Sequence, residues 1–351
     1  MSTGKLHLNL VEFYITNNCN FNCTGCNRFN NYAFTGTQKW QEYADIYQQW
    51  SQILDFDNFS ILGGEPMMNP TYLEWLKNII DLWPNANGTF VTNGHFLTPQ
   101  NQEFYDIVKG TNGRVSLEIG LHNNDRLESM IETVSAWLHG KILIKTIPEN
   151  LRSLPNFDSN WRRSYNAIRD ESWPDCNTVD DWDSLPDNIK DECITTHNFS
   201  PELLAKERLN YLITDSNGVK VTINRENFFH QGALKRNQNL SFELHNSDPK
   251  TAHNECSSKT CHHFDKGLLY KCGQVALFKE IDQQFYLEVT DQDRELIYSY
   301  KPGSVTDSQD RLREFVSTLH QPIPQCKFCP EKYDISMVVA EHGKKIKMLR
   351  K

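Results

Sequence analysis

The 351-residue sequence predicts an α/β fold with a parallel sheet, followed by a smaller cysteine-rich domain. Two observations support this prediction. Across the first 150 residues, short apolar runs alternate with amphipathic segments, and strands that alternate with helices form βα units with a parallel sheet. Five of the ten cysteines then fall between Cys256 and Cys329, where this alternation has ended. A chain of this length can hold one large domain and a small one.

The predicted elements follow from the period of the apolar residues. Strands are expected at 8–16, 59–62, 89–92, 115–121 and 142–147, and helices at 38–54, 70–82, 99–108 and 125–138. Thr98 is expected to cap the third helix, because Pro99 suits the first helical position. Asn217-Gly218 separates two alternating apolar runs, 208–214 and 219–223, and so predicts a hairpin.

Composition excludes several classes of protein. The formal net charge of −9 disfavours a broad nucleic-acid-binding face. A run of 18 apolar residues is missing, so a membrane span is not expected, and the N-terminus lacks the apolar core of a signal peptide. We therefore expect a cytoplasmic protein, in which cysteines serve metal binding or catalysis rather than disulfides.

Three cysteines near the N-terminus are the most informative feature. Cys19, Cys23 and Cys26 form a C-x3-C-x2-C pattern directly after the first apolar run. A short loop lets three thiolates converge on one metal centre, and a four-iron cluster with three cysteines keeps one iron open for a substrate. A zinc knuckle or a disulfide loop fits the same spacing.

Two further motifs narrow these alternatives. Gly63-Gly64-Glu65-Pro66 ends the second apolar run, and glycines there let the backbone approach a ligand. Thr92-Asn93-Gly94 ends the third. Together with the cysteine triplet, these segments resemble the signature of the radical S-adenosylmethionine (SAM) enzymes.

The resemblance implies a fold and a set of site residues. It implies a partial (β/α)6 TIM-like barrel with the active site at the carboxyl ends of its strands. Cys19, Cys23 and Cys26 are then the catalytic residues that hold a [4Fe-4S] cluster, whose open iron chelates SAM and whose electron releases a 5'-deoxyadenosyl radical. Gly63, Gly64, Glu65 and Pro66 are implied to bind SAM.

Other strand ends supply secondary candidates. Thr92 and Asn93 are expected to face the ligand, as is His122. Glu118 is expected to reach the SAM ribose and Lys145 the SAM carboxylate, unless either side chain lies on the outer pleat. Gly25 stands where the family often has an aromatic residue, so adenine stacking is left to Phe21 or Phe29.

The second group of cysteines resembles a twitch domain, the short form of the SPASM domain. Cys261, Gly267 and Cys272 form C-x5-G-x4-C, in which Gly267 allows a hairpin turn, and Cys326 and Cys329 form a later C-x2-C. The resemblance implies one auxiliary [4Fe-4S] cluster, because cysteines do not follow this pair. Ten residues separate Cys256 from Gly267, so Cys256 is an alternative to Cys261, and a four-cysteine zinc site fits as well. His262 and His263 are expected to be surface or packing residues.

The expected domains follow from these motifs. They are a radical SAM core at 1–147, an insertion at 148–204, the end of the barrel and a connector at 205–250, a twitch-like domain at 251–335 and a basic tail at 336–351. The insertion is expected either to cover the barrel mouth or to pack outside. Its cysteines, Cys176 and Cys193, are inert or donate a hydrogen atom to a product radical.

Taken together, the resemblance implies an enzyme that abstracts a hydrogen atom from its substrate. The substrate is expected to be a small molecule of the sugar or aminocyclitol kind, which would be oxidised, or a peptide, which would be crosslinked or epimerised. Flavodoxin or ferredoxin is the expected electron donor, with no membrane or nucleic-acid partner. The alternative from another class is a non-catalytic iron–sulfur or zinc protein.

Overall fold

The computed structural model describes residues 4–23, 26–32, 34–122, 126–137, 143–147, 193–195, 210–214, 218–225, 228–230, 234–236, 242–256, 258–285, 287–331 and 335–337. The expected insertion, apart from 193–195, and the expected basic tail, apart from 336 and 337, lie outside these residues. The chain divides into two compact units: unit 1 comprises Met1–Gly88 and Asn227–Lys351, and unit 2 comprises Thr89–Glu226. These boundaries do not coincide with those of the expected functional domains, which stay predictions.

The sheet of unit 1 brings the two ends of the sequence together. Its strand order is β13-β12-β1-β2, with β1 (Leu6–Tyr14), β2 (Leu54–Leu62), β12 (Cys261–Asp265) and β13 (Leu268–Tyr270). β1 runs parallel to both β2 and β12, and β12 runs antiparallel to β13. The segment that carries Cys261 is therefore a direct neighbour of the first strand.

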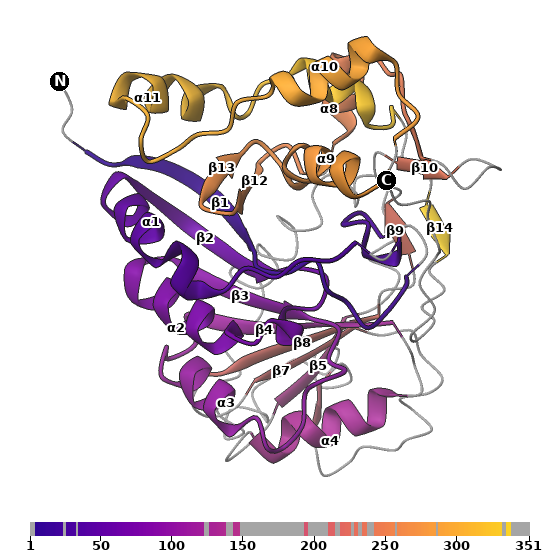
Figure 1. The fold of residues 1–351 in the computed structure, drawn as a ribbon. Helices are drawn as coiled ribbons and strands as arrows, with labels where there is room; N and C mark the ends of the chain where they lie inside the picture. The colour runs from indigo at the N-terminus through magenta and orange to yellow at the C-terminus, as the bar shows by residue number, and fades with distance from the viewer. Residues whose placement is uncertain are drawn as a thin grey trace. The chain divides into compact units, whose positions relative to one another are not determined.

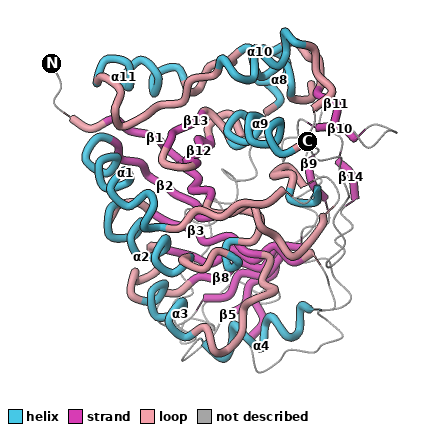
Figure 2. Tube along the Cα trace, viewed as in Figure 1, coloured by secondary structure: helices cyan, strands magenta, loops and turns pink. Residues whose placement is uncertain are grey.

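Helices surround this sheet (Figures 1 and 2). They are α1 (Trp40–Ile53), α2 (Tyr72–Leu82), α8 (Pro249–Glu255), α9 (Gly273–Gln284), α10 (Asp291–Ser299) and α11 (Gln309–Thr318), with 3-10 turns η1 (Asn30–Tyr32), η2 (Pro66–Met68) and η7 (Pro324–Phe328). Two short ladders complete the unit: β10 (Leu234–Arg236) with β11 (Phe242–Leu244), and β9 (Phe228–His230) with β14 (Ile335–Met337).

An aromatic core binds β12 to β1 beneath α1. The ring of Phe264 stacks on Phe13 at 5.3 Å between centroids and meets the edge of Trp50 at 5.2 Å. Trp50 also donates its indole N–H to the carbonyl of Gly267, at 2.8 Å. Because strand side chains alternate between faces, the odd-numbered residues of β12 point away from this core.

The β12–β13 turn confirms the predicted role of Gly267. Lys266 and Gly267 both have positive φ, 50° and 74°, which is the backbone of a tight two-residue hairpin. A Cβ at position 267 would lie 2.8 Å from Ile46 on α1, so space as well as backbone conformation requires glycine.

Unit 2 contains the expected βα units of residues 89–137. Its strands are β3 (Asn87–Thr92), β4 (Val115–Leu121), β5 (Leu143–Ile147), β6 (Cys193–Thr195), β7 (Asn210–Thr214) and β8 (Lys220–Arg225), in the order β3-β4-β8-β7-β5-β6. Its helices are α3 (Gln102–Lys109) and α4 (Leu127–Trp137).

The strand order of unit 2 differs from a simple succession of βα units. The predicted β7–β8 hairpin is confirmed, with Thr214 opposite Lys220. β8 pairs parallel to β4, so the hairpin separates β5 from β4. Burial gives the physical reason: Val221 and Ile223 of β8 are as deeply buried as Leu117 and Ile119 of β4, which they adjoin.

The predicted cap of the third helix is wrong. α3 begins at Gln102, and Asn101 precedes it as the N-cap residue. The Asn101 carboxamide oxygen accepts bonds from the backbone N–H of Thr98, at 2.7 Å, and from its hydroxyl, at 3.0 Å. Thr98 therefore opens the turn that leads into the helix, and Pro99 lies in that turn rather than in the helix.

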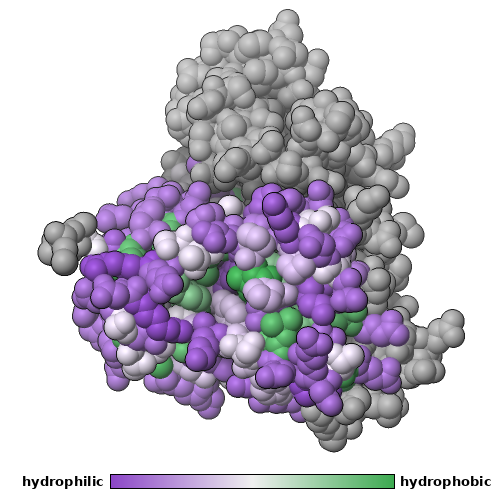
Figure 3. All heavy atoms as spheres, turned by 90° about the horizontal axis from the view of Figure 1, so that it is seen from above, coloured by the Kyte–Doolittle hydropathy of each residue, from purple (hydrophilic) through white to green (hydrophobic). Residues whose placement is uncertain are grey.

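Two surface findings complete the fold. None of the described helices is long and apolar enough to cross a membrane. Hydrophilic side chains cover most of the face of unit 1 that carries α10 and α11, and hydrophobic residues appear there as small separate patches (Figure 3).

Candidate metal centre

The first cysteine loop follows β1 and folds back on itself. The Cys26 N–H donates to the carbonyl of Cys23, at 3.2 Å, and the Phe29 N–H donates to the carbonyl of Cys26, at 3.1 Å. Cys23 is buried, and the thiol of Cys26 lies 3.7 Å from the carboxamide oxygen of Asn30. The three cysteines thus stand on one compact loop, which is a donor set that suits an iron–sulfur cluster.

The Gly63–Glu65 segment packs directly on the chain that enters this loop. Gly64 N–H donates to the carbonyl of Thr16 and Glu65 N–H to the carbonyl of Asn18, both at 2.7 Å. A Cβ on Gly64 would lie 2.4 Å from the oxygen of Asn18. Glycine at position 64 is therefore required by a close approach of backbone to backbone. The expected approach of this segment to a ligand stays a prediction.

Glu65 and Pro66 begin a short turn next to the cysteine loop. The Glu65 side chain is fully buried and accepts the N–H of Met67, at 3.0 Å, while Pro66 starts η2. Asn69 then donates to the carbonyl of Ile15, at 2.8 Å. The acidic side chain that the resemblance assigns to SAM is therefore fixed in place by the turn.

Gln38 is a central residue that sequence reasoning missed. Its buried carboxamide donates to the carbonyl of Tyr14, at 2.6 Å, and to the carboxylate of Asp265, at 2.7 Å. Its backbone carbonyl accepts the Asn69 side chain, at 2.7 Å. The side chain and the backbone of Gln38 thus join the end of β1, the β12–β13 turn and the loop after Pro66. A glutamine before an amphipathic helix gives no local signal of such a role.

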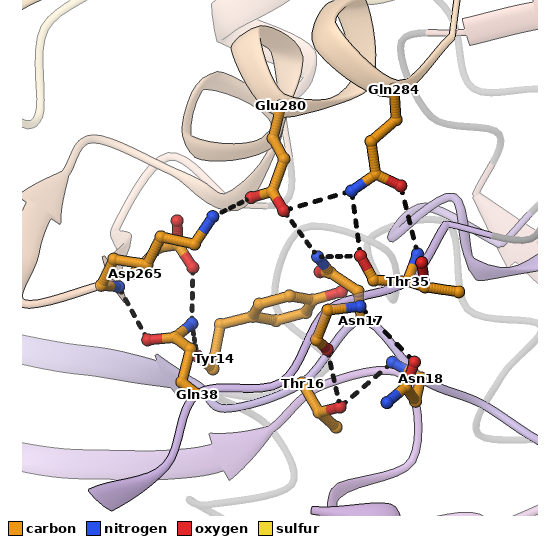
Figure 4. Close-up of polar contacts among 11 residues, drawn as sticks. Tyr14, Thr16, Asn17, Asn18, Thr35, Gln38, Asp265, Glu280 and Gln284 are labelled. Atoms are coloured by element: carbon orange, nitrogen blue, oxygen red, sulfur yellow. Dashed lines mark hydrogen bonds and ion pairs between the residues drawn. The ribbon is translucent and has the colours of Figure 1, made fainter. Parts of the chain in front are cut away.

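A polar network fastens the cysteine loop to α9 (Figure 4). Glu280 accepts the Asn17 side chain, at 3.1 Å, and pairs with Lys266, at 2.5 Å. Gln284 donates to the carbonyl of Thr35, at 2.9 Å. The helix that follows Cys272 is consequently anchored to both ends of the segment that carries Cys19, Cys23 and Cys26.

Asp265 in this network makes stability depend on pH. Burial raises the pKa of Asp265 to about 7, above its ordinary value near 3.9. Between these two values only the folded chain holds the proton, so the free energy of unfolding should fall as pH rises from about 4 to about 7, by at most about 1.4 kcal/mol per pH unit. Urea unfolding of Asp265→Asn should lack this fall.

The matched control for that experiment is Asp310→Asn, which removes an exposed carboxylate. It should keep the pH dependence of the wild type. An Asp265→Asn variant with an unchanged pH profile would contradict the assignment.

The second cysteine set gathers where α8, α9 and η7 meet. Cys256 is the residue after α8, Cys272 precedes α9 as its N-cap, and Cys326 lies in η7. Ser247 N–H donates to the carbonyl of Lys327, at 2.9 Å, and the rings of Phe278 and Phe328 meet at 5.7 Å. These contacts tie all three segments together.

Electrostatic interactions among the thiols identify the members of this set. Burial, followed by the charges of Cys256 and Cys326, raises the pKa of Cys272 to about 12. Burial also raises the pKa of Cys329, followed by the charges of Cys272, Cys256 and Cys326. These four thiols therefore lie within electrostatic range of one another.

Cys261 lies in a different environment. It is buried on β12 opposite Leu10 of β1. Burial lowers the pKa of the Arg28 guanidinium, whereas the carboxylate of Glu12 and, after it, the charge of Cys261 raise that pKa. Of the two alternatives that the spacing left open, the structure brings Cys256, rather than Cys261, to the other three cysteines.

A buried polar group lies beside both cysteine sets. Glu12 on β1 accepts Arg28, at 2.5 Å, and faces His263 of β12, at 3.3 Å. His263 is fully buried, and burial lowers its pKa. His262 is buried as well, so both histidines are packing residues in the fold. A glutamate within an apolar strand was the available signal for this group.

The remaining candidates belong to unit 2. Thr92 and Asn93 are buried, and their side chains accept the N–H groups of Gly94, at 3.0 Å, and His95, at 2.9 Å. Glu118 is half-buried and lies on the other face of β4 from Ile119. Its strand partner on β8 is Thr222. The backbone of Lys145 pairs with Leu212.

Other candidates of unit 2 are partly described. His122 follows the end of β4. The backbone of Cys193 begins β6, while Cys176 lies outside the described residues. In unit 1, Gly25 also lies outside them, and both Phe21 and Phe29 are buried.

In the described part of the chain, no three Cys, His, Asp or Glu side chains stand at metal-binding distance from one another. The fit to a metal group rests on the chemistry of the donors. Each site offers thiols from closely packed segments, three in the first and four in the second. Thiolates are the ligands that iron–sulfur clusters take, and four of them also suit zinc.

Comparisons with known proteins give weak likenesses. No family model and no curated protein matches the sequence. Among solved structures, BtrN in complex with AdoMet and 2-DOIA is 14% identical, with a TM-score of 0.39 over 93% of this chain and 94% of that one.

Two further structures match a smaller part. The chain spans less than half of anSMEcpe with bound AdoMet, at 14% identity, a TM-score of 0.30 and coverage of 37% and 40%. SuiB of Streptococcus suis bound to S-adenosylmethionine is 14% identical, with a TM-score of 0.23 over 36% of this chain and 38% of that one. At such scores the likenesses carry no argument, and the site rests on the chain's own residues.

Proposed function

We propose that this protein is a radical SAM enzyme. One observation carries the proposal: the Gly63–Glu65 backbone is bonded to Thr16 and Asn18, immediately before Cys19. Two motifs far apart in the sequence are thereby joined at one place, the carboxyl ends of the parallel strands β1 and β2. Ligands of α/β folds bind at such ends.

In this proposal Cys19, Cys23 and Cys26 hold a [4Fe-4S] cluster and leave one iron free for the amino and carboxylate groups of SAM. When bound, the cluster supplies the electron that splits SAM and yields the 5'-deoxyadenosyl radical. Gly63, Gly64, Glu65 and Pro66 form the wall next to the SAM site. The buried rings of Phe21 and Phe29 exclude water from the loop.

Further site residues complete the proposal. Cys256, Cys272, Cys326 and Cys329 hold an auxiliary [4Fe-4S] cluster in place of zinc. Thr92, Asn93, Glu118 and Lys145 remain the further residues that we expect to bind SAM. The substrate is a small molecule of the sugar or aminocyclitol kind, or a peptide, and its oxidation suits a second cluster that accepts an electron. Flavodoxin or ferredoxin supplies the first electron, in the cytoplasm.

The test is release of 5'-deoxyadenosine. Full-length protein would be reconstituted anaerobically with iron and sulfide and given SAM and dithionite. We expect product from the wild type and none from a variant with Cys19, Cys23 and Cys26 changed to Ala. The matched control is Cys261→Ala, a buried cysteine outside both sets, which should retain the activity.

A SAM-binding titration on the same samples interprets a negative result. Wild-type protein that binds SAM without cleaving it would be an enzyme that waits for its substrate. Protein that holds iron but does not bind SAM would contradict the proposal and indicate a non-catalytic iron–sulfur protein.

A further inference from the structure

Arg28 occupies an unusual position between the two cysteine sets of unit 1. It follows Cys26 by two residues, and its side chain is only 16% exposed. One side of the guanidinium donates to the Glu12 carboxylate, at 2.5 Å. Arginine is always protonated in proteins, so this is a permanent positive charge next to the first cysteine loop.

The other side of the guanidinium lies against the residue after Cys272. A Cβ built on Gly273 would come within 1.6 Å of the Arg28 Nη1 atom and 2.9 Å of its Cζ. Any side chain at position 273 would therefore displace the Arg28 guanidinium from this place. Glycine at this position therefore allows a cation from the first loop to approach the backbone at Cys272.

One further feature favours a negative group at the same place, and two contacts pack around it. The N-terminus of the 12-residue helix α9 lies there, with Cys272 as N-cap, and a helix N-terminus carries a partial positive charge. The Cε1 edge of the buried His263 lies 3.4 Å from the Gly273 Cβ position. Gln274 in the first turn donates to the carbonyl of Asn27, at 2.5 Å, and so holds helix and loop together.

We propose that Arg28 is a positioning residue shared by the two cysteine sites, whose charge stabilises the reduced form of the cluster that Cys272 helps to hold. A four-iron cluster with four thiolates is an anion and becomes more negative on reduction, and the reduction potentials of such clusters depend on nearby charge and hydrogen bonds. Glu12 opposes this effect, because its carboxylate partly neutralises the guanidinium. The inference rests on the auxiliary cluster of the proposed function.

The experiment is a potentiometric titration of the reconstituted full-length protein, followed by electron paramagnetic resonance. Excess SAM identifies the signals, because it alters only the cluster with an open iron. Arg28→Gln should shift the midpoint potential of the second cluster to a more negative value. Glu12→Gln should shift it to a more positive value, and Arg28→Lys should lie close to the wild type.

The matched control is Arg294→Gln. Arg294 also pairs with a buried carboxylate of α9, Asp282, but near the opposite end of that helix. This variant should leave the potential unchanged. Equal shifts in Arg28→Gln and Arg294→Gln would overturn the inference, since they would report a general loosening of α9.

The two proposals fail in different ways. A wild-type protein without a second iron–sulfur cluster, shown by its iron and sulfide content, would refute the auxiliary cluster and this inference together. A second cluster whose potential is the same in wild type, Arg28→Gln and Glu12→Gln would overturn the inference alone. If Arg28→Gln does not retain the cluster, the sign of the shift in Glu12→Gln decides.

Discussion

Cys256→Ala is expected to abolish iron binding at the second cysteine site, whereas Cys261→Ala should leave it intact. The thiol of Cys256 acts on Cys272, Cys326 and Cys329, and the thiol of Cys261 acts on Arg28. A cluster that loses one of four thiolate ligands loses the closed coordination that holds it. The measurement is the iron and sulfide content of each variant after anaerobic reconstitution.

Both substitutions remove one thiol from unit 1, so each serves as the control for the other. Cys272→Ala should behave like Cys256→Ala. A Cys261→Ala variant that loses the second cluster, beside a Cys256→Ala variant that keeps it, would reverse the assignment. Loss of half the iron in both would show that neither residue alone decides the ligand set.

The second large effect is expected at Gly64. A methyl group there would stand 2.4 Å from the carbonyl oxygen of Asn18 and 2.7 Å from its carbon, and backbone atoms cannot move aside as a flexible side chain can. Overpacking of this kind costs about 3 kcal/mol. Gly64→Ala should therefore lower the free energy of unfolding in urea and also reduce iron retention by Cys19, Cys23 and Cys26.

The control for this prediction is Gly110→Ala at the end of α3. Gly110 has a right-handed backbone, with φ of −61°, and the nearest atom to its Cβ position is 3.3 Å away. Alanine there should be neutral or stabilise by about 0.5 kcal/mol. Equal stability of Gly64→Ala and the wild type would show that the segment does not pack on Asn18 as described.

Elements that depend on neighbouring residues were predicted well from the sequence. The strands at 115–121 and 143–147 were located to within one residue, because alternation of buried residues is a local property. The hairpin turn at Gly267 was predicted for the same reason, since two successive residues with positive φ favour glycine. Cys19, Cys23 and Cys26 likewise lie within one loop, so their spacing could be recognised from the sequence.

Sequence reasoning was weaker wherever distant segments meet. The expected cap at Thr98 was wrong because the Asn101 side chain accepts hydrogen bonds from Thr98 and holds it in a turn before the helix. The insertion of β8 between β4 and β5 depends on which buried faces match, and periodicity does not report that. The close backbone contact of Gly63 and Gly64 with Thr16 and Asn18 was not predicted, because it joins segments far apart in the sequence.

The sequence by itself determined the βα alternation, the two cysteine groups and the family that their motifs resemble. These are properties of residues close together in the chain, for which local chemistry and spacing are sufficient. Only the tertiary structure shows that Cys256 lies within electrostatic range of Cys272, Cys326 and Cys329 and that Arg28 lies between Glu12 and Gly273. Whether Cys256 or Cys261 binds a cluster stays a prediction. These positions depend on the packing of α8, α9 and η7 around one point. That packing is set by burial and contact between segments far apart in the sequence, which local spacing does not encode.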